Sequence, residues 1–296
     1  MKNRFVTVES CIEWLEFRKR TQNIDYEIVE CEGIEFILQY RDIKQGFKTP
    51  FKFITATHSP LIRNKNIKSD EILKIYKEIL QKRLKKITNI KVRHFSLGYE
   101  FNDEDLVRDI FSDFKVKRWA TFMTKIDNLD KLWKSYRSKI RYEVNKSKRQ
   151  GLYIKELEES DLIESLKIKN EAKQRDSLKL MSEKTWKVNL MFYIKSKFFL
   201  PIGVFKEDKM VATAILSYYG NTMSWGGLAV SNFAKENRLN ALHYLNWWAI
   251  KKAFLLELRY FDTVGYNPLN RNKREDGIYL FKKRLANLDI KYFLLE

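Results

Sequence analysis

The sequence predicts an α/β or α+β fold in which helices pack on a mixed sheet. Runs with alternating apolar residues, typical of strands, recur between runs with apolar residues every three or four positions, typical of helices. The two halves of the 296 residues show similar mixtures of these runs. We therefore expect two domains, residues 1–120 and residues 121–296.

Each element of the N-terminal half has its own local signal. Two alternating runs flank Glu32-Gly33, which predicts a hairpin turn. A strand ends before Pro60, and an amphipathic helix begins at Ser69-Asp70. The expected elements are a helix at 9–21, the hairpin at 26–40, a strand at 51–60, a helix at 70–87, a strand at 92–101, a short helix at 103–114 and a strand at 117–126.

The C-terminal half contains a long helix and a three-stranded meander. Asp127 or Asn128 is a suitable cap for the helix, and Gly151 suits its C-terminal end. Two tight turns, at Glu207-Asp208 and Gly220-Asn221, join the strands of the meander. The expected elements are a helix at 129–150, a strand at 152–157, helices at 160–175 and 182–197, three strands within 198–230, a helix at 235–257, a strand at 259–265, a short helix from 276 and a strand at 290–295.

The chain is strongly basic, with a net charge of +19. This charge favours an anionic partner, namely nucleic acid, a nucleotide-bearing substrate or an acidic membrane surface. A lysine-biased composition without a binding role explains the charge equally well, because 38 acidic residues are present and the lysines are spread along the whole chain.

Cysteine and histidine are too few and too scattered for a zinc site or a disulfide framework, so we expect no metal and a reducing compartment. The first residues lack the apolar core of a signal peptide, and the longest apolar run is interrupted by Lys251 and Lys252. We expect a cytoplasmic protein that is able to contact a membrane surface peripherally.

Basic residues line one face of the helix expected at 129–150. At about 100° per residue, Arg137, Arg141 and Lys148 fall together with Lys134, away from an apolar stripe. Arg149, near the C-terminal end, also fits a favourable interaction with the helix dipole. This face is either an anion site or a solvated basic surface, and the pattern does not decide between them.

A second group of polar residues follows the strand at 259–265. Asp262, Tyr266 and Asn267 lie at the end of this strand, where α/β sheets bind ligands. The alternative is a turn in which Asp262 caps main-chain amides. Farther along, Phe281 and Lys282 form an aromatic and cationic pair of the kind that stacks on a base or holds a phosphate.

From Trp133 to Glu296 the chain resembles the Fem family of peptidyltransferases, which is built on the GNAT acyltransferase fold. Four segments carry the resemblance, in the family's order: the basic helix end, the hairpin GVFKEDKMVATAILSYYG, a strand with an Asp and a Gly, and a Phe-Lys segment. The matching residues are Arg141, Val144, Lys146, Arg149, Gly151, Phe261, Asp262, Gly265, Gly277, Ile278, Phe281 and Lys282. The resemblance implies two tandem GNAT-like domains, the N-terminal one degenerate.

The family transfers an amino acid from aminoacyl-tRNA to an amine of a peptidoglycan precursor. By resemblance, Arg141 with Lys148 or Arg149 would hold the phosphates of an anionic nucleotide- or lipid-linked cell-wall precursor. Phe281 and Lys282 would contact the acceptor end of the tRNA. Arg137 and Asn267 are further candidates for substrate binding.

The implied chemistry is acyl transfer by direct attack of an amine, because no GxSxG motif or Cys/His pair suggests a covalent acyl-enzyme. Lys282 would stabilise charge, while Asp262 and Tyr266 would orient groups or handle a proton. No cofactor stays bound; the donor is aminoacyl-tRNA or acyl-CoA. Residues 231–241 lack a Gly-rich pyrophosphate loop, which disfavours acetyl-CoA. The other alternative is an RNA-binding protein without catalysis.

Overall fold

A computed structural model describes residues 8–43, 51–62, 67–87, 90–269 and 273–296. The described residues form two compact units. Unit 1 contains those of Met1–Thr121, Gly265–Asn272 and Asp289–Glu296, and unit 2 contains Phe122–Val264 and those of Lys273–Leu288. The expected division into residues 1–120 and 121–296 differs from this one, because two C-terminal segments belong to unit 1.

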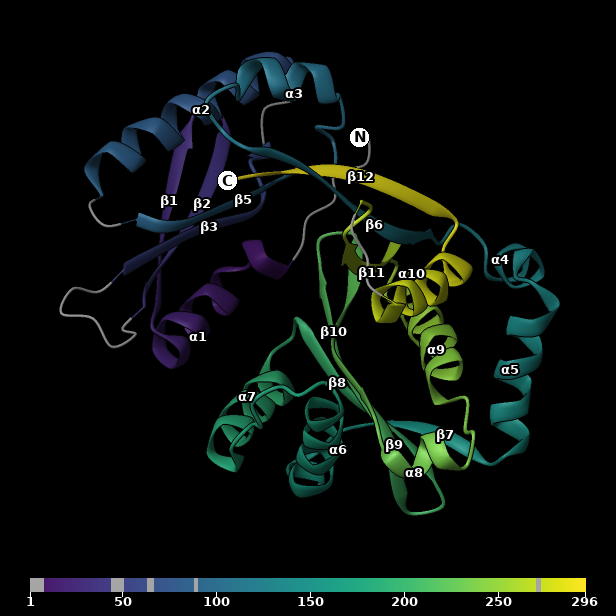
Figure 1. Ribbon diagram of the computed structural model, residues 1–296. Coiled ribbons are helices and arrows are strands. Elements are labelled where there is room, and N and C mark those ends of the chain that lie inside the picture. The colour runs from purple at the N-terminus through teal and green to yellow at the C-terminus, as the bar shows by residue number, and fades with distance from the viewer. Residues whose placement is uncertain (1–7, 44–50, 63–66, 88–89, 270–272) are drawn as a thin grey trace. The chain divides into compact units, whose positions relative to one another are not determined.

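Unit 1 contains a mixed sheet with strand order β1-β2-β3-β5-β12 (Figure 1), and β4 pairs with β2. The pairs are antiparallel except for β3 with β5, which is parallel. The strands are β1 (Ile24–Cys31), β2 (Ile34–Ile43), β3 (Phe51–Ser59), β4 (Leu61–Ile62), β5 (Ile90–Leu97) and β12 (Leu288–Leu295). The helices are α1 (Ile12–Gln22), α2 (Ser69–Lys86) and α3 (Glu104–Ile110), with a 3₁₀ turn at Val8–Ser10.

The sequence of the first hairpin explains how unit 1 builds its core. Glu32 and Gly33 have φ angles of 53° and 73°, so both adopt the left-handed conformation of a type I′ turn. Alternation along β2 then buries Phe36 on the face of α2, with ring stacking on Tyr76 at 5.1 Å. On the other face, Gln39 accepts a hydrogen bond from Arg18 of α1 at 2.5 Å.

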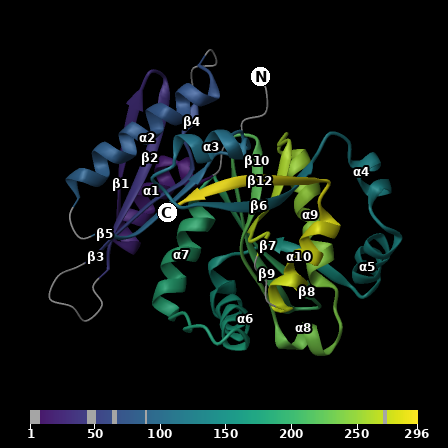
Figure 2. The ribbon, with the colours of Figure 1, turned by 45° about the horizontal axis from the view of Figure 1, so that its top comes forward.

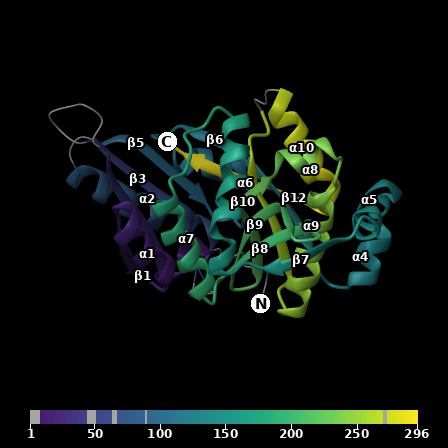
Figure 3. The same ribbon diagram turned by 90° about the horizontal axis from the view of Figure 1, so that it is seen from below.

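The described strands of unit 2 follow the order β11-β10-β9-β8-β7, in which β10 and β11 pair in parallel and the other pairs are antiparallel. Helices α6 and α7 lie on one side of β8–β10, and α5 and α9 lie on the other (Figures 1 and 3). The strands are β7 (Leu152–Glu156), β8 (Phe199–Lys206), β9 (Lys209–Tyr219), β10 (Thr222–Val230) and β11 (Tyr260–Tyr266). The helices are α4 (Leu129–Ser135), α5 (Ser138–Arg149), α6 (Leu162–Arg175), α7 (Glu183–Lys195), α8 (Asn232–Glu236), α9 (Ala241–Leu255) and α10 (Lys273–Leu285), with a 3₁₀ turn at Glu159–Asp161. Strand β6 (Val116–Lys125) carries the chain from unit 1 into unit 2.

The prediction of one continuous helix at 129–150 is wrong. Asn128 caps α4, and Gly151, with φ of 76°, follows α5, but the helix breaks at Tyr136 and Arg137. Both have extended backbone, with ψ of 142° and 145°. The break lets the Tyr136 hydroxyl donate to the main-chain oxygen of Leu285 at 3.0 Å, which anchors the ring in the core.

The helix expected at 235–257 is likewise two helices, α8 and α9. The chain turns at residues 237–240, where Leu239 is buried and its N–H donates to the oxygen of Ala234. The last helix, α10, begins at Lys273, three residues before the expected start. No helix among the described residues is long and apolar enough to cross a membrane.

Candidate active site

The parallel strands β10 and β11 frame a pocket in unit 2. Their paired residues run from Thr222–Tyr260 to Ser224–Asp262. The residues that follow on both strands line a pocket of about 340 Å³, which α9 and α10 complete. Its lining is mostly apolar and contains one charged side chain: Trp225, Gly226, Gly227, Leu228, Leu242, Thr263, Val264, Ile278, Phe281 and Lys282. A mostly apolar pocket with few polar groups is typical of a ligand site.

A β-bulge forms the β10 wall of the pocket. The register with β9 shifts between Gly226, which faces Ile215, and Ala229, which faces Thr213. Gly227 lies in the bulge with φ of 55°, a conformation that favours glycine. The indole nitrogen of Trp225, just before the bulge, is buried without a hydrogen-bond partner among the described residues.

Helix α10 brings Phe281 and Lys282 to the pocket, beside α9 (Figures 1 and 2). The Phe281 ring stacks on Trp225, with centroids 6.0 Å apart, and makes an edge contact with His243 of α9 at 5.2 Å. The Nζ of Lys282 donates to the main-chain oxygen of Val264 at 2.9 Å. Burial lowers the pKa of Lys282, and the charge of Asp262 acts in the opposite direction.

The end of β11 holds a strained turn. The side chain of Asp262 is buried, and its Oδ1 accepts a hydrogen bond from the N–H of Val264 at 2.8 Å. Val264 has a φ of 68°, which is rare for a β-branched residue. Asp262 therefore makes the turn contact that was one of its two expected roles, and it also acts electrostatically on Lys282. Backbone strain of this kind concentrates at functional sites.

Tyr266 and Asn267 do not line this pocket, and both belong to unit 1. The hydroxyl of Tyr266 donates to Asp289 Oδ1 at 2.8 Å. The side-chain oxygen of Asn267 accepts from the N–H of Leu269 at 3.0 Å. The contacts shown for these two side chains therefore organise the chain that follows β11.

The predicted basic face is divided between two helices. Because of the break at Tyr136, the spacing that placed Lys134 and Arg137 in line with Arg141 does not apply. Arg141 donates from Nη1 to the main-chain oxygens of Lys134 and Tyr136, each at 2.8 Å, and so satisfies the end of α4. Its guanidinium thus has a structural role that the sequence did not predict. The side chains of Arg137, Lys148 and Arg149 are exposed, and Arg149 lies over the Tyr142 ring at 5.7 Å.

Sequence reasoning missed the β10 wall and His243. The stretch SWGGLAV (224–230) contained a signal, because two adjacent glycines inside a strand indicate a bulge or a close approach to the backbone. His243 gave no signal on a helix of mixed composition. Burial lowers the pKa of His243, while the charge of Glu143 raises it.

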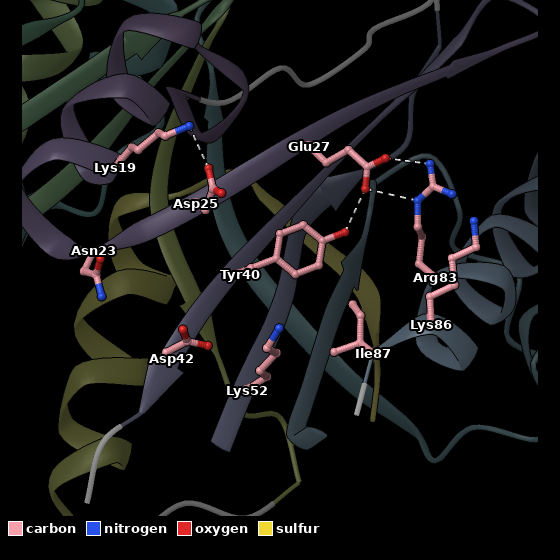
Figure 4. Close-up of a pocket in the computed structure, with 10 residues that line it drawn as sticks. All are labelled: Lys19, Asn23, Asp25, Glu27, Tyr40, Asp42, Lys52, Arg83, Lys86 and Ile87. Carbon is pink, nitrogen blue, oxygen red and sulfur yellow. Dashed lines mark hydrogen bonds and ion pairs between the residues drawn. The ribbon is translucent and has the colours of Figure 1, made fainter. Parts of the chain in front are cut away.

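Unit 1 contains a separate, charged hollow of about 850 Å³ between the ends of α1 and α2 and the strands β1–β3 (Figure 4). Most of its charges are paired. Glu27 accepts from Arg83 and from the hydroxyl of Tyr40, and Lys19 pairs with Asp25 at 2.9 Å. These internal pairs engage four of the charged residues that line the hollow. In the described ranges, no group of three His, Cys, Asp or Glu side chains is placed to hold a metal ion.

The fold matches solved structures of other proteins, although no protein-family model and no curated protein sequence matches the chain. FemX superposes with a TM-score of 0.70 at 13% identity, over 95% of this chain and 90% of that one. L-PGS from Bacillus licheniformis superposes with a TM-score of 0.59 at 14% identity, over 95% of this chain and 86% of that one. The C-terminal domain of a putative lysylphosphatidylglycerol synthetase from Agrobacterium fabrum superposes with a TM-score of 0.58 at 9% identity. The match covers 92% of this chain and 83% of that one. The predicted mixed α/β fold of the Fem type is therefore confirmed.

Proposed function

We propose that this protein is an acyltransferase that transfers an aminoacyl or acyl group to an amine. The pocket between β10 and β11 carries the proposal, because it places Lys282 against the strained end of β11 in a chain with the fold of FemX. A half-buried ammonium in a mostly apolar pocket is suited to stabilise the negative charge that develops on an ester carbonyl under attack.

The attack is direct in this proposal. The amine of the acceptor attacks the carbonyl carbon of the donor, the ester or thioester bond breaks, and the hydroxyl or thiol leaves with one proton. Lys282 stabilises the oxyanion. Asp262, whose charge acts on Lys282, keeps this lysine oriented. No residue is acylated, so both substrates bind before the reaction.

We favour aminoacyl-tRNA over acyl-CoA as the donor because of the N-terminal end of α9. A helix N-terminus with free N–H groups is a ready site for a diphosphate. Here the side chain of Asn240, which precedes α9, donates to the carboxylate of Glu143. The main-chain oxygen of Asn240 accepts from the hydroxyl of Ser147 at 3.1 Å. The nearby carboxylate disfavours a diphosphate at this place. The net charge of +19 suits a polyanion such as tRNA.

We infer that the acceptor is an amine on an anionic cell-wall or surface-polysaccharide precursor, linked to a nucleotide or a lipid. The structural neighbours include a protein whose name states that it makes a lysyl-bearing phospholipid, and FemX. The exposed Arg137, Lys148 and Arg149 are our candidates for its phosphates, together with Arg141. Tyr266 remains our candidate for orienting groups or handling a proton, and Asn267 remains a candidate for substrate binding. We place this reaction in the cytoplasm.

A thermal-shift screen combined with a transfer assay tests the proposal. Aminoacyl-tRNA, nucleotide-linked cell-wall precursors and acetyl-CoA are added separately to the purified full chain. We expect stabilisation by the first two, and passage of labelled amino acid from tRNA to the precursor. Stabilisation by acetyl-CoA alone would overturn the choice of donor. A salt-dependent shift with tRNA, without transfer to any amine, would instead favour a non-catalytic RNA-binding protein.

A further inference from the structure

A lysine on α6 is buried directly behind the pocket wall. The side chain of Lys169 is 7% exposed, and its Nζ donates to the main-chain oxygen of Gly227 at 2.6 Å. Gly227 itself is exposed and lines the pocket. The ammonium thus reaches from the α6–α7 side of the sheet to the back of the wall that the acyl donor would face.

The contact with Gly227 depends on that residue being a glycine. A Cβ added at Gly227 would lie 2.9 Å from the Nζ of Lys169. The left-handed backbone at this position also disfavours a side chain. The left-handed conformation of Gly227 and its lack of a side chain are therefore both compatible with the position of the Lys169 Nζ, whereas a residue with a side chain is not.

The other neighbours hold the amine in place without neutralising it. The ring of Trp186, on α7, has its centroid 4.4 Å from the Nζ, and its indole N–H donates to Ser165 Oγ on α6 at 2.8 Å. No ion pair of Lys169 is seen among the described residues. The charge that acts on it is that of Lys173, one turn farther along the same helix, and it is repulsive.

Burying a cation without a carboxylate is unfavourable, and an apolar side chain of similar length would fill the same space at lower cost. Burial lowers the pKa of Lys169 to about 7, which shows how strongly this place disfavours the charge. Packing alone therefore does not explain why this residue is a lysine. The hydrogen bond from its Nζ to the main-chain oxygen of Gly227 does explain it.

We propose that Lys169 is a positioning residue for acyl transfer, which fixes the β10 wall of the pocket by holding the carbonyl of Gly227. This proposal rests on the proposed function of the pocket. Lys169 acts through Gly227 and the adjoining Leu228. When the bond is removed, the wall becomes mobile and the donor is held less accurately, so the chemical step slows more than binding weakens.

The test compares Lys169→Met with Lys167→Met in the full chain. Lys167 is exposed on the same helix, so its variant controls for the loss of a lysine. The first measurement is amide hydrogen exchange of the peptide that covers residues 222–230. We expect roughly tenfold faster exchange in Lys169→Met and no change in Lys167→Met. Unchanged exchange in Lys169→Met would overturn the positioning role, whatever the protein's activity.

The second measurement is transfer from aminoacyl-tRNA, with the melting temperature recorded alongside. We expect Lys169→Met to lower kcat on the order of tenfold, with a smaller change in KM and no loss of thermal stability. A full kcat, or a fall that only follows a lower melting temperature, would overturn the proposal. Wild-type protein that transfers nothing would refute the proposed function, and the exchange measurement still decides whether Lys169 holds the wall. Lys169→Leu, which also lacks a hydrogen-bond donor, replaces the Met variant if that variant does not fold, with the same expected results.

Discussion

The Nζ of Lys282 lies 2.9 Å from the main-chain oxygen of Val264, so helix α10 is tied to the strained end of β11 by the one charged side chain in the pocket lining. Lys282 thereby has a fixed position before any substrate arrives. Fixed groups of this kind stabilise a developing charge better than mobile ones, because little reorganisation is needed during the reaction.

Replacing Lys282 by alanine should abolish most of the transfer activity. We expect kcat to fall on the order of a hundredfold, since the developing oxyanion loses its cation. The free energy of unfolding should change by less than about 1 kcal/mol, because Lys282 is only partly buried and its hydrogen bond to Val264 lies at an exposed position. Lys283→Ala is the matched control, an exposed neighbour on the same helix. Full activity of Lys282→Ala would remove Lys282 from the mechanism.

Arg141→Ala should lower both stability and transfer. Two main-chain oxygens, those of Lys134 and Tyr136, lose their donor, which should cost about 1–2 kcal/mol in the free energy of unfolding. If Arg141 also binds substrate phosphate, transfer should fall far more than this loss explains. Arg137 is exposed, and its side chain makes no capping hydrogen bond at the start of α5. Arg137→Ala should therefore leave the free energy of unfolding unchanged. Denaturant unfolding and the transfer assay separate the two effects, and full transfer by Arg141→Ala would contradict a role in substrate binding.

Gly227 in the β10 bulge and Gly277 in helix α10 should respond in opposite ways to replacement by alanine. Gly227→Ala meets a left-handed backbone and the Nζ of Lys169, and should lower the free energy of unfolding by about 1–3 kcal/mol. Gly277→Ala, in helix α10, meets nothing within 4 Å, and should raise it by up to about 1 kcal/mol. Chemical denaturation measures both. Equal stability of the two variants would show that the bulge does not require glycine.

Lys169 should make the stability of the protein depend on pH. Its pKa is lowered from 10.5 to about 7 on folding, so the unfolded chain binds the proton more tightly between these values. The destabilisation is complete below about pH 7, shrinks as the pH rises, and vanishes above the unfolded pKa. The melting temperature of Lys169→Met should therefore be higher than that of the wild type at about pH 7. The difference between the two melting temperatures should be smaller at about pH 9.5. A margin that stays constant would mean that Lys169 titrates normally.

The sequence predicted those elements whose signals are local. The hairpin at Glu32-Gly33 and the helix that begins at Ser69 depend on nearby residues, and both are present. The break after Tyr136 depends on Leu285, 149 positions away, and neither a proline nor a glycine marks it. Such a break is invisible to helical periodicity.

The same distinction applies to the candidate site. Phe281 and Lys282 were predicted as site residues because the chain resembles a known family. In the structure both residues line one pocket together with the end of β11. Lys169 looked like one more surface lysine among 57 basic residues, because burial of a lysine depends on tertiary packing alone. Arg141 was expected to bind a substrate anion, while its contacts show that it also completes a helix end.

Strand β12, the last element of the chain, pairs with β5 of unit 1 through Leu294–Ser96 and Leu295–Phe95. Phe293 and Leu295 are buried in the core of that unit. During synthesis, unit 1 therefore lacks one strand until the residues of β12 have been made, whereas most of unit 2 precedes that strand. A ribosome-stalled chain that stops before β12 should hold an incomplete sheet in unit 1 with an open edge at β5, a state that is exposed to chaperones and to aggregation.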